Sequence, residues 1–282
     1  MKNAPKQLGD FEILRELGRG GMGVVYEAKQ KSLNRRVALK VLSTGLGLST
    51  KAIMRFKREA EAAAKLHHTN IVPIYSTGEE NRTPYYAMEL IDGPSLDQVI
   101  RQFRQDASEP PPAELESTHD FHGEQSPSEI PDWVAGTIGL GKPESDGPAS
   151  SSTSSVSSSS SLTGGQYYDN VARMTAEVAD ALAHAHDLGV IHRDIKPSNL
   201  LLSADGRLSV NDFGLARMLE QPGMTISGEL MGSPMYMSPE QIAAGRLPLD
   251  HRTDIYSLGA TLYEMLTLRP PFDGRQRDQV LS

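Results

Sequence analysis

Residues 190–214 read VIHRDIKPSNLLLSADGRLSVNDFG, and this stretch guides the interpretation of the rest of the chain. Three polar side chains in it, those of Asp194, Asn199 and Asp212, stand out against apolar surroundings. Two carboxylates and a carboxamide gathered at the ends of strands supply the oxygen ligands that Mg²⁺ prefers. An Asp beside such a metal ion can orient a hydroxyl group and take its proton. The stretch therefore predicts a magnesium site with a carboxylate base beside it.

The same stretch resembles two loops of eukaryotic-like protein kinases, the catalytic loop and the metal-binding loop. Their signature is H-R-D with an Asn five residues after the Asp, followed by D-F-G. The resemblance implies that Asp194 orients a substrate hydroxyl group, and that Asn199 and Asp212 bind Mg²⁺, with Mn²⁺ as an alternative. Lys196, two residues after Asp194, has the serine/threonine-kinase form and is expected near the γ-phosphate of ATP.

The composition indicates a chain that needs no covalent cross-links. Its 282 residues include no Cys, which excludes disulfides and thiolate metal sites and fits a reducing compartment. Residues 1–10 lack the apolar core of a secretory signal, and no stretch approaches the roughly 20 apolar residues of a membrane span. We therefore expect a cytoplasmic protein, with membrane attachment through a missing C-terminal continuation as an open alternative.

Glycines interrupt a strand-like pattern over residues 11–42, at Gly18, Gly20 and Gly23. This G-x-G-x-x-G spacing also occurs in Rossmann units, where the loop opens a helix and an acidic residue follows about 20 positions later. Here β-branched residues follow directly, and Lys40 stands near that later position. The pattern therefore favours a strand–loop–strand flap, whose glycines let backbone N–H groups approach phosphates.

Lys40 lies within an apolar strand pattern, where an ammonium group without an anionic partner would be costly. The helical pattern of residues 50–66 places Glu59 on the same face as the apolar Phe56 and Leu66. The resemblance to kinases makes Glu59 the partner of Lys40 and assigns the α- and β-phosphates to Lys40. A surface position for Glu59 is the alternative.

Residues 84–91 read as a strand that leads into the hinge between the two lobes. By resemblance, Met88 is the gatekeeper, and the segment from Glu89 to Ile91 is the hinge whose backbone meets adenine. Adenine needs a flat apolar slot. The other residues at positions that match this slot are Leu17, Val25, Ala38 and Leu201.

A segment of biased composition separates two helical patterns. Residues 110–112 are three prolines, residues 150–161 are almost entirely serine, and residues 101–166 carry ten acidic side chains against three basic ones. Such a segment cannot bury enough apolar surface to offset its chain entropy. We expect a disordered insertion from about 103 to 165. Trp133 is then a chance apolar residue in a loop, with docking on some other surface as the alternative.

The residues after Gly214 up to S-P-E at 238–240 resemble a kinase activation segment with its closing A-P-E. Arg193 could pair with a phosphate on this segment, with Thr225 and Ser227 as the acceptors. By resemblance, Asp254 matches a buried Asp that braces the catalytic loop. His192 likewise matches a residue that anchors the backbone beneath the Phe of D-F-G.

These observations predict an α+β protein-kinase-like fold with two lobes. We expect an N-terminal tail at 1–10, an N-lobe at 11–91 with an antiparallel sheet and one regulatory helix, and a mainly helical, incomplete C-lobe at 92–282. The resemblance is to bacterial eukaryotic-like (Hanks-type) serine/threonine protein kinases, truncated in the C-lobe. It implies transfer of the ATP γ-phosphoryl group to Ser and Thr hydroxyl groups of protein substrates.

The resemblance also implies regulation by autophosphorylation of the activation segment, with self-association as its route. No basic face for nucleic acid and no membrane segment within the chain are expected. Three alternatives remain: a pseudokinase scaffold, a small-molecule kinase, and a nucleotide-binding oxidoreductase. The pattern after Gly23 disfavours the third, and the presence of an activation segment disfavours the second.

Overall fold

Alternating apolar residues fold the N-terminal part of the chain into one six-stranded antiparallel sheet with the strand order β1-β2-β3-β4-β6-β5. The computed structural model describes residues 6–20, 23–42, 50–80, 83–108, 131, 133–138, 163–213, 234–243 and 248–272. The strands are β1 (Gln7–Leu8), β2 (Phe11–Gly20), β3 (Gly23–Gln30), β4 (Arg35–Leu42), β5 (Ile74–Glu80) and β6 (Thr83–Met88). Residues 7 and 8, expected to belong to a tail, pair with the start of β2 instead.

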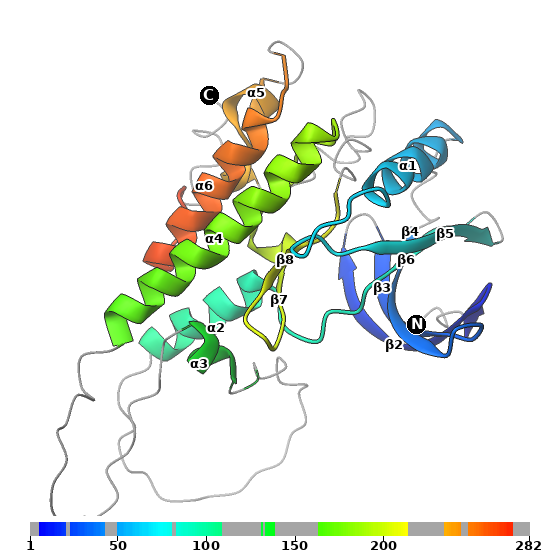
Figure 1. The fold of residues 1–282 in the computed structure, drawn as a ribbon, viewed down its shortest axis with the longest axis horizontal. Coiled ribbons are helices and arrows are strands. Elements are labelled where there is room, and N and C mark those ends of the chain that lie inside the picture. The colour runs from blue at the N-terminus through cyan, green and yellow to red at the C-terminus, as the bar shows by residue number, and fades with distance from the viewer. Residues whose placement is uncertain are drawn as a thin grey trace, which may run out of the picture.

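The two faces of the sheet bury different side chains because neighbouring residues of a strand point in opposite directions. On β4, Leu39 packs into a cluster on the outer face, and Ala38 packs into a cluster beneath helix α1 (Thr50–Ala63). Phe56 of α1 lies against Tyr86 of β6, with 5.5 Å between ring centroids. Figure 1 shows α1 beside β4 and β5, on the side of the sheet that faces the rest of the chain.

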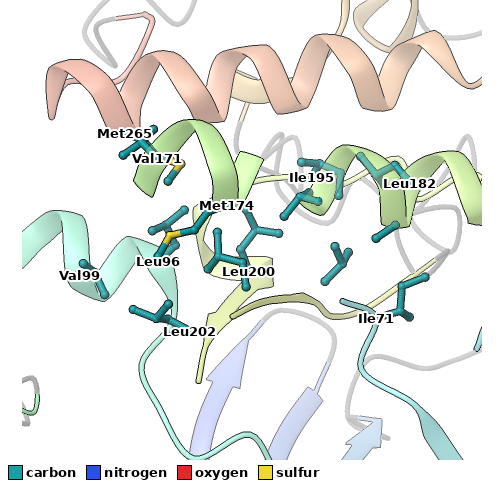
Figure 2. Packing of buried hydrophobic residues seen from close by; sticks show 14 of the residues in the cluster. Ile71, Leu96, Val99, Val171, Met174, Leu182, Ile195, Leu200, Leu202 and Met265 are labelled. Carbon is teal, nitrogen blue, oxygen red and sulfur yellow. The ribbon is translucent and has the colours of Figure 1, made fainter. Parts of the chain in front are cut away.

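The C-terminal part is mainly helical, as expected, and it packs around α4. Its elements are α2 (Leu96–Ser108), α3 (Trp133–Ile138), α4 (Thr163–Asp187), β7 (Leu200–Leu202), β8 (Leu208–Val210), α5 (Pro239–Ile242) and α6 (Arg252–Thr267), with 3-10 turns at Pro197–Asn199 and Pro234–Tyr236. Apolar residues recur along α4 at helical spacing, so one stripe of the helix is buried. Figure 2 shows Val171 and Met174 of this stripe between Met265 of α6 and Leu96 of α2.

A backbone link joins the two parts beside the β7–β8 hairpin. Val72 donates its N–H to the carbonyl of Val210 (2.9 Å), and Val210 donates to the carbonyl of Asn70 (2.8 Å). The amide of the Asn70 side chain also donates to the carbonyl of Leu208 (2.8 Å). The segment before β5 is therefore fixed to the hairpin that leads to Asp212.

The prediction of a disordered stretch from about 103 to 165 is wrong at both ends and in its middle. Helix α2 continues to Ser108, α4 begins at Thr163, and α3 lies within the stretch. Val134 and Ile138 of α3 are buried in the C-terminal core. They stand four residues apart, so they share one face of the helix, which fits against α4.

Trp133, interpreted as a chance apolar residue, packs against the same core, so the docking alternative was the correct one. Residues 109–130, 132 and 139–162, where the rest of the disorder prediction falls, lie outside the described residues. Among the helices that the structure describes, none combines the length and the apolar character needed to cross a bilayer.

Candidate active site

Asp194, Lys196 and Asn199 form one hydrogen-bonded cluster at the turn that precedes β7. The Lys196 ammonium contacts both carboxylate oxygens of Asp194, at 2.7 Å and 3.0 Å. The Asn199 side-chain amide donates to the Asp194 carbonyl (2.7 Å) and to one of its carboxylate oxygens (3.0 Å). Pro197 opens the 3-10 turn that brings Asn199 back toward Asp194. Three of the predicted site residues thus lie together.

Asp254 at the start of α6 holds the backbone just before this cluster. Its side chain is fully buried, and its two oxygens accept the backbone N–H groups of His192 (2.8 Å) and Arg193 (2.6 Å). The ring of His186 contacts the same carboxylate (2.8 Å). Arg193 has a positive φ of 69°, an unusual conformation for a residue other than glycine, which these bonds stabilise. The expected brace is present.

Burial alone would raise the pKa of the Asp254 carboxyl group. The hydrogen bond from His186, the charge of His192 and the backbone N–H groups outweigh burial, and they hold this pKa below its ordinary value. Asp254 is therefore ionised at neutral pH although it is buried.

His192 is fully buried and anchors the segment that leads to Asp212. One ring nitrogen lies 2.8 Å from the carbonyl of Asn211, and the other accepts the N–H of Asp194. Its ring meets the edge of the Phe213 ring, with 4.7 Å between centroids. This matches the anchoring position expected for His192 and gives it no proton-transfer role.

Asp212 contacts two side chains of the sheet in the N-terminal part. Its Oδ2 lies 2.5 Å from the Lys40 ammonium of β4, and its Oδ1 accepts a hydrogen bond from the Tyr86 hydroxyl of β6 (2.8 Å). Burial alone would raise the pKa of Asp212, but the charge and hydrogen bond of Lys40, together with the Tyr86 hydroxyl, hold it below its ordinary value. The carboxylate is therefore ionised and paired with the Lys40 ammonium.

Comparison with known proteins identifies the family of this chain. The sequence model of protein tyrosine and serine/threonine kinases matches residues 11–282. The chain belongs to the protein kinase family. It is 32% identical to the serine/threonine-protein kinase PrkC of Bacillus subtilis over 94% of this chain, which is 32% of PrkC. It is also 32% identical to PknB of Mycobacterium leprae, over 96% of this chain and 34% of PknB.

The fold agrees with a solved kinase structure. The crystal structure of the PknI kinase domain of Mycobacterium tuberculosis aligns with a TM-score of 0.60 and 26% identity, covering 97% of this chain and 80% of the PknI chain. The chain thus has the two-lobed kinase fold, and it spans about a third of the length of the curated relatives it matches. Kinases of this family use ATP and a divalent metal ion, and they act on proteins.

Most residues predicted to line the adenine slot of this kinase fold gather in one cluster. Ala38 and Met88 are buried opposite each other on β4 and β6, and three of the other predicted residues are partly buried and pack against their cluster. These three are Val25, Ile91 and Leu201. Leu17 of β2 is 39% exposed and lies outside that cluster. The N–H of Glu89 donates to the carbonyl of Pro73 (3.1 Å), which ties the hinge to the residue that precedes β5.

The three glycines of the flap have different surroundings. A Cβ atom added at Gly18 or Gly20 would meet nothing within 4 Å, whereas one added at Gly23 would lie 2.1 Å from the Val41 carbonyl oxygen. Gly23 is therefore needed for the close approach of β3 to β4. Gly18 and Gly20 stand next to open space, where a phosphate could come near the backbone.

Replacing Gly23 with Ala is expected to lower the free energy of unfolding by about 1–3 kcal/mol, the usual range for overpacking. The reason is that the backbone of β4 cannot move away without breaking the β3–β4 ladder. Chemical unfolding monitored by circular dichroism measures the change. Gly20→Ala is the matched control, and equal losses for the two variants would contradict this account of Gly23.

The predicted pair of Lys40 and Glu59 stays a prediction. Glu59 lies on α1, between the buried Phe56 and Ala60, but its side chain is outside what the structure describes. Lys40 contacts Asp212, which lies 172 residues further along the chain. No local pattern in the sequence indicates that contact.

Sequence reasoning missed two residues that contact the site, Tyr86 and His186. The contact of His186 with Asp254 depends on how α6 packs on α4, which no local sequence pattern shows. The sequence did offer a sign of the role of Tyr86. It lies in an apolar strand pattern, and a hydroxyl group on a buried strand needs a hydrogen-bond partner.

The expected activation segment is described only at its C-terminal end. Gln241 of α5 donates from its side chain to the Arg193 carbonyl (2.7 Å), so this end contacts the catalytic loop directly. Tyr236 donates its hydroxyl to the Glu264 carboxylate of α6, which also binds Arg104 of α2 (2.5 Å). Thr225 and Ser227 lie outside the described residues.

Proposed function

We propose that this chain is a serine/threonine protein kinase that transfers the γ-phosphoryl group of ATP to Ser and Thr hydroxyl groups of proteins. The observation that carries the proposal is a backbone hydrogen bond between its two loops. Asn211 donates its N–H to the carbonyl of Asn199 (2.9 Å), so the residue before Asp212 is tied to the Asn of the catalytic loop. This hydrogen bond supports the proposal that the oxygen ligands and the carboxylate base form one site, as phosphoryl transfer requires.

Asp212 and Asn199 are the residues that would hold Mg²⁺, with Mn²⁺ as a substitute. The chemistry of these donors suits the ion, since Asp212 is an anion. The side-chain nitrogen of Asn199 already donates to Asp194, which leaves its side-chain oxygen Oδ1 as the ligand atom. A bound magnesium ion neutralises charge on the phosphates.

The other side chains position the two reactants. Asp194 would accept a hydrogen bond from the substrate hydroxyl and take its proton as the new bond to phosphorus forms. Lys196, already in contact with Asp194, would place a positive charge beside the transferred group. Lys40 would bind the α- and β-phosphates, and the apolar cluster around Ala38 and Met88 would take adenine.

Protein substrates, self-association and regulation by autophosphorylation are the remaining parts of the proposal. Thr225 and Ser227 are the proposed acceptors, and Arg193 is the proposed partner of their phosphates. A cytoplasmic location is proposed with them, since a chain without Cys fits a reducing compartment that also supplies ATP.

Transfer of labelled γ-phosphate from ATP to a general protein substrate in the presence of Mg²⁺ tests the activity. Acid hydrolysis of the product should yield phosphoserine and phosphothreonine. Phosphotyrosine alone would contradict the choice of acceptor. Nucleotide binding without any transfer would favour the pseudokinase alternative.

A further inference from the structure

The hydroxyl group of Tyr86 is buried in the N-terminal lobe and points to the metal site. Tyr86 is 1% exposed, and its ring packs on Phe56 of α1. A phenylalanine would fill this space without bringing a polar atom into it. The hydroxyl would be costly there without an acceptor, and it finds one in Oδ1 of Asp212 (2.8 Å).

Strand register places Tyr86 and Lys40 side by side. Lys40 of β4 pairs directly with Tyr86 of β6, so the two side chains leave the same face of the sheet. They meet a single carboxylate, with Lys40 at Oδ2 and Tyr86 at Oδ1 of Asp212. The N-terminal lobe therefore holds both oxygens of a residue that belongs to the C-terminal lobe.

The two donors cannot both keep their bonds when nucleotide binds. Under the proposed function Lys40 turns to the phosphates, which releases Oδ2 of Asp212 as a ligand atom. The Tyr86 hydroxyl is not needed at the phosphates, so it can keep its hydrogen bond to Oδ1 of Asp212. Asp212 also has a positive φ of 64°, so its local backbone is in a sparsely populated region.

We propose that Tyr86 is a positioning residue for Asp212, which keeps Oδ1 bonded and so fixes the orientation in which Oδ2 binds the divalent cation. This inference rests on the proposed function, since it assumes that Asp212 is a metal ligand. Hydrogen bonds from such outer residues orient metal ligands, and their loss typically weakens metal binding 10- to 100-fold.

The test compares Tyr86→Phe with Tyr85→Phe in the full chain. Both substitutions remove one hydroxyl group from β6, but Tyr85 packs on the opposite face, against Phe11. Binding of Mn²⁺ is measured by electron paramagnetic resonance in the presence of ADP, together with ADP binding in the absence of metal and the melting temperature of each variant.

We expect the Kd of Mn²⁺ to rise about tenfold or more in Tyr86→Phe and to stay at the wild-type value in Tyr85→Phe. ADP binding without metal should not change. In Tyr86→Phe, the Mg²⁺ concentration for half-maximal activity should rise by a factor similar to that for the Kd of Mn²⁺. The kcat of this variant at saturating Mg²⁺ should stay close to that of the wild type.

An unchanged Kd of Mn²⁺ in Tyr86→Phe would overturn the proposal and leave Tyr86 with a packing role. A wild-type chain that binds no Mn²⁺ with ADP would overturn the metal site at Asp212 itself. The second outcome is seen before any substitution is made, so the two failures are distinguishable.

Discussion

Replacing Asp194 with Asn should lower the rate of phosphoryl transfer by about 10²- to 10⁴-fold, the range for loss of a general base. Asn keeps the size of the side chain and can still accept a hydrogen bond, but it cannot take the proton of the substrate hydroxyl. The ion pair with Lys196 is lost as well, which frees that ammonium within the site. Steady-state transfer of labelled phosphate measures the rate.

Nucleotide binding separates a chemical defect from a folding defect in this variant. Because Asp194 contacts neither Lys40 nor the adenine cluster in the described structure, Asp194→Asn should bind a fluorescent ATP analogue with near wild-type affinity. Asp205→Asn, in the exposed turn between β7 and β8, is the matched control. Wild-type turnover in Asp194→Asn would show that another group accepts the proton.

Replacing Asp254 with Ala should cost roughly 3 kcal/mol of unfolding free energy and remove most of the activity. The substitution leaves the backbone N–H groups of His192 and Arg193 without their acceptor in the protein interior. The turn that positions Asp194 would then lose its brace. Chemical unfolding and the transfer assay measure the two effects.

The free energy of unfolding, measured as the pH is lowered, gives a second test of Asp254→Ala. The pKa of Asp254 is lower in the folded chain than its ordinary value of 3.8. Its contribution to stability is therefore present above that value and is lost as the pH falls through the lower folded pKa. The Ala variant should lack this part of the acid transition.

Asp250→Ala is the control, because Asp250 is an exposed partner of Arg252 just before the same helix. It should change stability little. If Asp250→Ala and Asp254→Ala destabilised the chain equally, the brace would not explain the effect.

Sequence reasoning predicted the parts of the site that are contiguous in the chain. Asp194, Lys196 and Asn199 lie within six residues, so a short turn is enough to bring them together. The division into a sheet and a helical part also follows from local patterns, because alternation of period two and helical spacing are both visible in short windows.

Contacts between distant segments could not be predicted in the same way. The convergence of Lys40 and Tyr86 on Asp212 depends on the register of β4 and β6 and on how the lobes meet. Helix α3 was missed because it is six residues long and lies in a stretch whose composition favours disorder. Its apolar face is buried by contact with α4, which is distant in the sequence, so a short window could not show it.

Under the proposed function, one metal-bound nucleotide is surrounded by Lys40, Asp212, Asn199 and Asp194. Titration of the wild-type chain with a fluorescent ATP analogue, with and without Mg²⁺, tests it most directly. We predict that Mg²⁺ raises the affinity for the triphosphate at least several-fold, since Asp212 and Asn199 bind the ion together with the phosphates. Equal affinity in the presence and absence of the ion, or no binding at all, would contradict the account.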